Sequence, residues 1–92
     1  KVKNEKAATL LTTATNIVLN AVRSVFQTYV ESLKESGTFD TTAQTTALTK
    51  AKDIALSQFG DDVKEYISTT YGNLDGWLTN QIESTINLLK NN

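Results

Sequence analysis

The sequence predicts an all-α fold in which a long N-terminal helix packs against two or three shorter helices. Apolar residues recur at alternating spacings of three and four, which is typical of amphipathic helices. No run of residues alternates between apolar and polar with the period of two that a half-buried strand would show. The 92 residues include no proline and four glycines, and the glycines mark the breaks between the helices.

The first helix is predicted over residues 4–35. Its apolar seam consists of Ala8, Leu11, Thr15, Val18, Val22, Val25 and Tyr29. Between Ala7 and Val30 the one charged residue is Arg23, whereas an ordinary surface helix exposes Lys and Glu. One side of this helix is therefore expected to be buried, and the other side is polar but almost uncharged. Gly37 is expected to end it in a left-handed conformation.

Two further helices are predicted over residues 42–59 and 62–71. Asp40 or Thr41 is expected to cap the first of them. The buried face of that helix is predicted to consist of Ala43, Ala47, Leu48, Ala51, Ile54, Ala55 and Phe59. Gly60 indicates a break between the two helices, but the apolar stripe keeps its phase across it. One kinked helix is therefore an alternative, because an interior glycine costs only about 1 kcal/mol relative to alanine.

The last helix is predicted over residues 75–90. The segment Tyr71-Gly72-Asn73 is the clearest break in the second half of the chain, and Asn73 or Asp75 can cap the helix that follows it. The residues expected to be buried are Leu78, Ile82, Ile86 and Leu89. Trp77 and Leu88 are expected to flank them.

The chain divides into a basic N-terminal junction, residues 1–6, and a single helical domain, residues 7–92. A chain of this length buries only about 60–65% of its unfolded surface, and it has no Cys or His for a disulfide or a zinc site. The first helix would be about 48 Å long, against a diameter of about 30 Å for a compact chain of this size. Its first half should therefore overhang the rest of the subunit.

A second copy of the chain is the simplest cover for that overhang, and a homo-oligomer is therefore expected. The self-association is predicted to be coiled-coil-like and to run through the seam residues Leu11, Thr15, Val18, Val22 and Val25. Arg23 could pair with an acidic residue later in the chain or with a neighbouring subunit.

The residue inventory argues against an enzyme. The chain has no His and no Cys, so the commonest general base and the commonest thiol nucleophile are both missing. Asp61 and Asp62 are the one pair of adjacent acidic residues, and a pair directly after a glycine is typical of a helix N-terminus. No pattern for a metal, a phosphate or a dinucleotide is present. We therefore expect no catalytic residues, no metal, no cofactor and no small-molecule substrate.

Nucleic acid is not an expected partner either. The net charge is −1, whereas a nucleic-acid-binding domain normally shows a basic face. The aromatic residues are not interleaved with basic ones, so they are expected to pack in the core rather than to stack on bases.

Lys1, Lys3 and Lys6 form a small basic cluster at the start of the chain. One interpretation is a solvated terminus. The other is a set of juxtamembrane lysines that follow a membrane span and mark its cytoplasmic side. Within the chain no stretch reaches the 18 or more apolar residues that a span needs. The threonines of the first helix could line a wet lumen in a membrane, but the exposed surface of a soluble oligomer is the favoured interpretation.

The order of features resembles a known family. The segments that carry the resemblance are residues 21–23 (AVR), 25–29 (VFQTY), 51–56 (AKDIAL), 74–78 (LDGWL), 81–86 (QIESTI) and 88–90 (LLK). They resemble the soluble part of phage holins of the LLH type, from about Ala21 onward. That family implies an N-terminal membrane span, a basic junction and a helical, coiled-coil-prone domain. The chain departs from the family in having no span and in the Thr-rich residues 41–49.

The resemblance implies a phage or prophage holin-like protein. Its soluble, oligomerising domain would then support permeabilisation of the host membrane during lysis, at the cytoplasmic face of that membrane, with the membrane reached through a segment upstream of Lys1. The alternative is a soluble, cytoplasmic, all-helical phage structural or adaptor protein that acts by protein–protein interaction. A third interpretation, a secreted Thr- and Asn-rich helical protein, predicts a cleaved signal peptide upstream.

Overall fold

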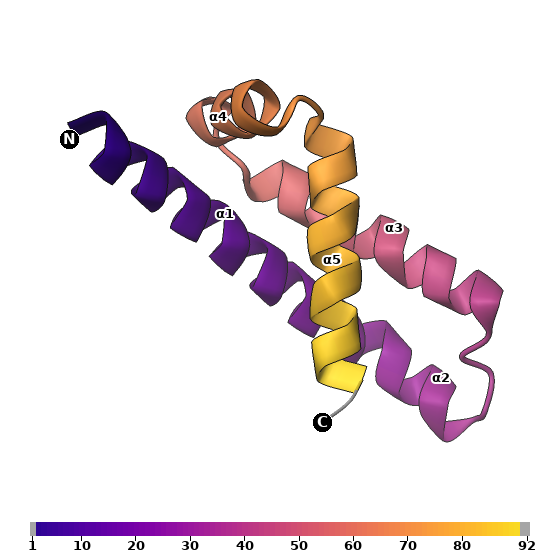
Figure 1. The fold of residues 1–92 in the computed structure, drawn as a ribbon. Coiled ribbons are helices and arrows are strands. Elements are labelled where there is room, and N and C mark those ends of the chain that lie inside the picture. Colours follow the sequence, from indigo (N-terminus) through magenta and orange to yellow (C-terminus); the bar gives the residue numbers. More distant parts are fainter. Residues whose placement is uncertain (1, 91–92) are drawn as a thin grey trace.

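The computed structural model of the protein describes residues 2–90, and it describes the side chains of residues 5–88. Every element in this part of the chain is helical, which confirms the all-α prediction. In chain order the elements are α1 (Val2–Val25), the π-helical segment η1 (Phe26–Val30), α2 (Glu31–Glu35), α3 (Thr41–Gln58), α4 (Asp61–Tyr71) and α5 (Leu74–Lys90) (Figure 1).

The elements α1, η1 and α2 follow one another without a break and form one long helix, as the sequence predicts. At about 1.5 Å per residue this helix spans about 51 Å, and the whole molecule measures 50 × 22 × 19 Å. The long helix therefore sets the length of the molecule. The backbone of residues 2–6, predicted as a basic junction, is already helical and continues directly into the rest of α1.

The segment η1 is a feature that the sequence analysis missed. Val25 and Val30 lie five residues apart and are both buried, with 3% and 0% of their surface exposed. Regular α-helical spacing would have placed Tyr29 at the buried position, as predicted, whereas Tyr29 is only half-buried. The wider π turn accommodates one extra residue and so keeps the last valine of the seam in the core.

The long helix ends in a Schellman motif around Gly37. Gly37 has φ +73°, a conformation that glycine adopts without steric cost. The Thr38 N–H donates to the Leu33 carbonyl at 2.8 Å, and the Gly37 N–H donates to the Lys34 carbonyl at 3.2 Å. These two bonds satisfy carbonyls that the helix end leaves free, and they confirm the predicted role of Gly37.

Small side chains define the inner side of α3. Asp40 caps the helix, since its Oδ1 accepts a hydrogen bond from the Ala43 N–H at 2.9 Å. The buried residues of α3 are Ala43, Ala47, Ala51 and Ala55. Their spacing of four places them on one ridge, and their small size lets α3 lie close to α1. Leu48 and Ile54, also predicted on this face, are partly buried against the core.

A short extended segment separates α3 from α4. Phe59 has ψ 127° and Gly60 has ψ 165°, so neither residue continues the helix. The alternative of one kinked helix is therefore wrong. The change of direction carries α4 back toward the first half of α1 (Figure 1), where Val63 and Ile67 are buried in the common core.

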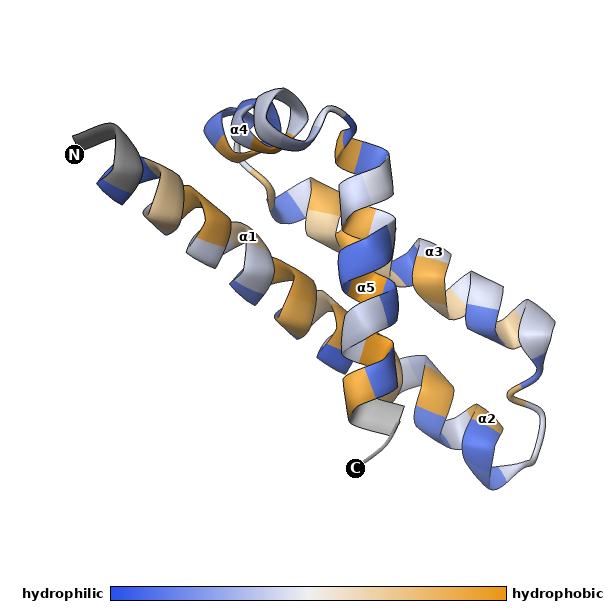
Figure 2. Ribbon diagram, viewed as in Figure 1, coloured by the Kyte–Doolittle hydropathy of each residue, from blue (hydrophilic) through white to orange (hydrophobic). Residues whose placement is uncertain are grey.

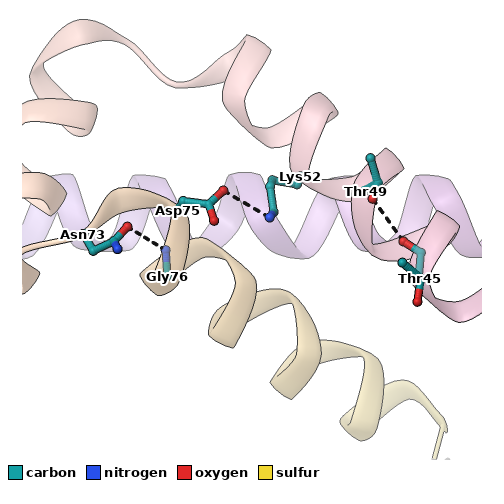
Figure 3. A network of polar contacts seen from close by, with 6 residues as sticks. All are labelled: Thr45, Thr49, Lys52, Asn73, Asp75 and Gly76. Carbon is teal, nitrogen blue, oxygen red and sulfur yellow. Dashed lines mark hydrogen bonds and ion pairs between the residues drawn. The ribbon is translucent and has the colours of Figure 1, made fainter.

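α5 starts at a capped turn and closes the core. The Gly76 N–H donates to Asn73 Oδ1 at 3.0 Å, which confirms Asn73 as a cap. Lys52 Nζ of α3 lies 3.1 Å from Asp75 Oδ1 beside this turn (Figure 3). Leu78 and Ile82 are fully buried, and Trp77, predicted at the flank, is also buried. The side chain of Leu89 lies outside the described residues.

All three shorter helices pack on the inner side of α1. The core residues that α1 supplies are Ala14, Val18, Ala21, Val22 and Val25. Leu10, Leu11 and Ile17 pack against this core as partly buried residues. The prediction that the first half of α1 overhangs its own subunit is therefore wrong, because the α4 helix turns back to cover it. Figure 2 shows hydrophobic and hydrophilic residues recurring along α1 turn by turn.

Two leucines of α5 provide a matched test of this core. Leu78 is 0% exposed and Leu88 is 68% exposed. Leu78→Ala should lower the free energy of unfolding by about 2–5 kcal/mol, because it removes buried methyl groups and leaves a cavity. Leu88→Ala should change it by less than about 0.5 kcal/mol. Urea denaturation followed by circular dichroism measures both, and equal losses would contradict this packing.

Candidate functional site

The adjacent acidic residues Asp61 and Asp62, considered above as a possible catalytic pair, lie at the start of a helix. Asp61 and Asp62 form the first turn of α4 and are exposed. Asp62 Oδ1 accepts a hydrogen bond from the Val63 N–H at 2.8 Å. Negative charge at this end of a helix complements its dipole. Among the residues that the structure describes, no three His, Cys, Asp or Glu side chains gather as a metal site would require.

The predicted self-association seam is divided between the core and the surface. Val18, Val22 and Val25 are buried inside the chain's own core, with 1%, 1% and 3% of their surface exposed. Leu11 is partly buried, and Thr15 is exposed. The three valines are thus covered by the same chain, since α3, α4 and α5 lie over them. A second copy could reach this side of α1 only by displacing those helices.

The opposite side of α1 forms a continuous exposed strip, which we call the outer face. Its exposed residues are Glu5, Ala8, Thr9, Thr12, Thr13, Thr15, Asn16, Asn20 and Arg23, and the partly buried Leu19 lies among them. The two charged residues stand at its ends, and every side chain between them is uncharged. A solvent-facing helix usually carries charged residues along such a face. The outer face is therefore the surface of this molecule that departs most from an ordinary helix.

Hydrogen bonds within the helix reduce the polarity of the outer face further. The Thr9 hydroxyl donates to the Glu5 carbonyl at 2.9 Å, and the Thr15 hydroxyl donates to the Leu11 carbonyl at the same distance. This backbone contact satisfies the hydroxyl. α3 shows the same pattern, in which the Thr49 hydroxyl donates to the Thr45 carbonyl (Figure 3).

The basic cluster of the sequence is only partly described. Lys1 and the side chain of Lys3 lie outside the described residues, while Lys6 is exposed. Lys6 lines an open groove of about 410 Å³ between α1 and α4, opposite a set of α4 residues. These residues are Asp61, Asp62, Glu65, Tyr66, Thr69 and Thr70.

Within residues 2–90, no helix has the length and apolar character needed to cross a membrane.

A second groove, of about 230 Å³, lies between the first turns of α3 and the end of α5. Phe39, Leu48 and Ile86 supply its apolar atoms, and Glu83 is its charged lining residue. It is partly open to solvent. Its lining holds one carboxylate, that of Glu83, together with the side chains of Thr41, Gln44, Thr45 and Asn87.

The aromatic residues line the packed interior and its edges rather than a base-stacking platform. Trp77 is buried, and the Tyr71 ring lies 6.0 Å from it, between ring centres. Tyr29 is half-buried beneath Lys50, whose Nζ lies 5.0 Å from the ring centre. Trp77 is thus buried as predicted, whereas Tyr71 is 47% exposed and does not pack in the core.

No protein-family model, no curated protein and no solved structure matches this chain. The resemblance to LLH-type holins therefore stays a prediction.

The position of Val18 changes what its replacement should do. In the sequence analysis Val18 belongs to an oligomer seam, where an aspartate would only separate subunits. Because Val18 is 1% exposed inside one chain, Val18→Asp buries an unpaired charge and should abolish cooperative unfolding. Asn20→Asp places the same group on the exposed surface two residues away and should leave the helical circular dichroism spectrum intact. A folded Val18→Asp monomer would contradict this placement.

Proposed function

We propose that the chain is a non-enzymatic helical interaction module that works by pairing its long helix with another helix, and that the first partner is a second copy of itself. The observation that supports this proposal is the outer face of α1. All the apolar residues of the inner side are already used by the chain's own core. What α1 offers to a partner is a strip of alanine, threonine and asparagine, together with the partly buried Leu19, with charge only at its ends.

Such a strip is suited to helix pairing. Surfaces that keep a protein monomeric carry interspersed Lys and Glu side chains, and burying those long side chains costs conformational entropy. The small side chains between Glu5 and Arg23 avoid most of that cost and allow two helices to approach closely. The hydroxyls of Thr9 and Thr15 are already bonded to the backbone, and covering the strip would require Thr12, Thr13, Asn16 and Asn20 to find hydrogen-bond partners across the interface.

Self-association should therefore depend on concentration and require no ligand. Sedimentation equilibrium between about 10 µM and about 1 mM, a range typical of weak complexes, should show a rise in mass above that of the 10.1 kDa chain. Thr12→Lys, at the middle of the outer face, should weaken the association at least about tenfold. Gln58→Lys, on an exposed position of α3, adds the same charge elsewhere and is the control. A monomer at every concentration would overturn the proposal.

A narrower form of this function is a second proposal: a holin-like protein of a phage or prophage, whose helical domain assembles at the cytoplasmic face of the host membrane and supports lysis. The placement of the N-terminal end of α1 at one extremity of the molecule favours it (Figure 1). An apolar segment upstream could continue the helix there without meeting the other elements. Lys6, exposed near that end, would lie close to the headgroups. A phage structural or adaptor protein is the competing form.

The coding sequence upstream of Lys1 separates these two forms. The holin-like form requires a run of about 20 apolar residues there without a signal-peptide cleavage site. A polar or very short leader would rule out that form and favour the adaptor. The self-association test applies equally to both.

A further inference from the structure

We infer that the outer face of α1 pairs with the same face of a second copy in an antiparallel arrangement, in which Glu5 of each chain meets Arg23 of the other. This inference rests on the proposed self-association and specifies its surface and its direction. It starts from the two charges that end the outer face.

Glu5 and Arg23 lie on the same line of the helix surface. They are separated by 18 residues within the continuous α-helix Val2–Val25, and 18 residues at 3.6 per turn make five complete turns. Their side chains therefore leave the helix in the same direction, about 27 Å apart. Both are exposed, and neither forms an ion pair with another residue that the structure describes.

The residues between them are arranged symmetrically. The midpoint of the 5–23 interval is Ala14, which is 0% exposed and points into the core. Eight of the nine exposed positions fall in pairs at equal distances from that midpoint: Glu5 with Arg23, Ala8 with Asn20, Thr12 with Asn16, and Thr13 with Thr15. The ninth, Thr9, has the partly buried Leu19 at the matching distance. A two-fold axis between two antiparallel copies at this height sets the outer face of one copy against the outer face of the other.

Charge selects the antiparallel direction. With a two-fold axis at the midpoint, Glu5 of each copy faces Arg23 of the other, and the dimer gains two cross-chain ion pairs. In a parallel pair, Glu5 would face Glu5 and Arg23 would face Arg23, so both contacts would be repulsive. An interface of this kind is isologous, because both copies use the same surface, and it closes as a dimer. The end charges favour the antiparallel orientation and also disfavour the parallel one.

The size of the strip sets the strength of the complex. It is about 27 Å long and about 10 Å wide, the width of one helix, which is less than the roughly 800 Å² per partner of a standard stable interface. A weak, reversible dimer fits such a surface. Arg23 also acquires the role left open in the sequence analysis, where a neighbouring subunit was one of its two candidate partners.

Charge reversal tests the inference. Glu5→Lys and Arg23→Glu each replace two attractive contacts by two repulsive ones, and each should raise the dissociation constant at least about tenfold in sedimentation equilibrium at low salt. The double variant Glu5→Arg/Arg23→Glu restores opposite charges and should return the constant to within about threefold of the unchanged chain. Asp53→Lys, on an exposed position of α3, matches the charge change of Glu5→Lys and should have no such effect.

A distance measurement tests the direction independently. The chain has no cysteine, so Ser24→Cys gives one spin label per chain at an exposed position ten residues beyond the midpoint. The antiparallel dimer separates the two labels by about 30 Å along the axis, and a parallel dimer brings them within about 10 Å, the spacing of packed helices.

The outcomes separate the inference from the proposed function. Association that is insensitive to both single reversals, a double variant that stays dissociated, or labels about 10 Å apart would overturn the inference and leave self-association standing. An unchanged chain that remains monomeric up to about 1 mM would overturn both.

Discussion

The fold depends on covering the inner side of one helix that is as long as the whole molecule. The buried valines of α1 and η1 extend from Val18 to Val30, and no single shorter helix spans the length of the long helix. α3 runs back along it, the Phe59–Gly60 segment redirects the chain, and α4 and α5 complete the cover. With no disulfide and no proline in the chain, this apolar contact carries most of the stability.

The two sides of α1 therefore have separate tasks. The inner side is consumed by intramolecular packing, so the chain does not need a partner to complete its core. The exposed residues of the outer face are not part of that core, and charge stands only at the two ends of the face, at Glu5 and Arg23. Association through it would add a layer to a finished domain. That is the physical difference between a reversible pairing module and an obligate oligomer, whose monomer leaves apolar surface open.

Local signals in the sequence predicted most of the helical architecture. The observed helices Thr41–Gln58, Asp61–Tyr71 and Leu74–Lys90 each begin and end within one residue of the predicted ranges, and Gly37, Asp40 and Asn73 act as turn and cap residues. The long-range features could not be predicted in this way. The path of α4 follows from the backbone angles of Phe59 and Gly60, and η1 follows from the need to bury Val30; neither leaves a distinct pattern in the sequence.

The same limit explains why the seam of α1 was predicted to meet a second copy of the chain. Periodicity shows that Val18 and Val22 must be hidden, but it cannot say whether the cover comes from the same chain or from another. For the outer face, the open question is not which chain covers it but in which direction and register two copies would pair. A neutral strip of small residues has little preference for direction or register, since shifted and inverted pairings bury similar groups. Charges placed only at the ends, five turns apart, remove that degeneracy, because a parallel pairing sets like charges opposite each other and a shifted one separates Glu5 from Arg23.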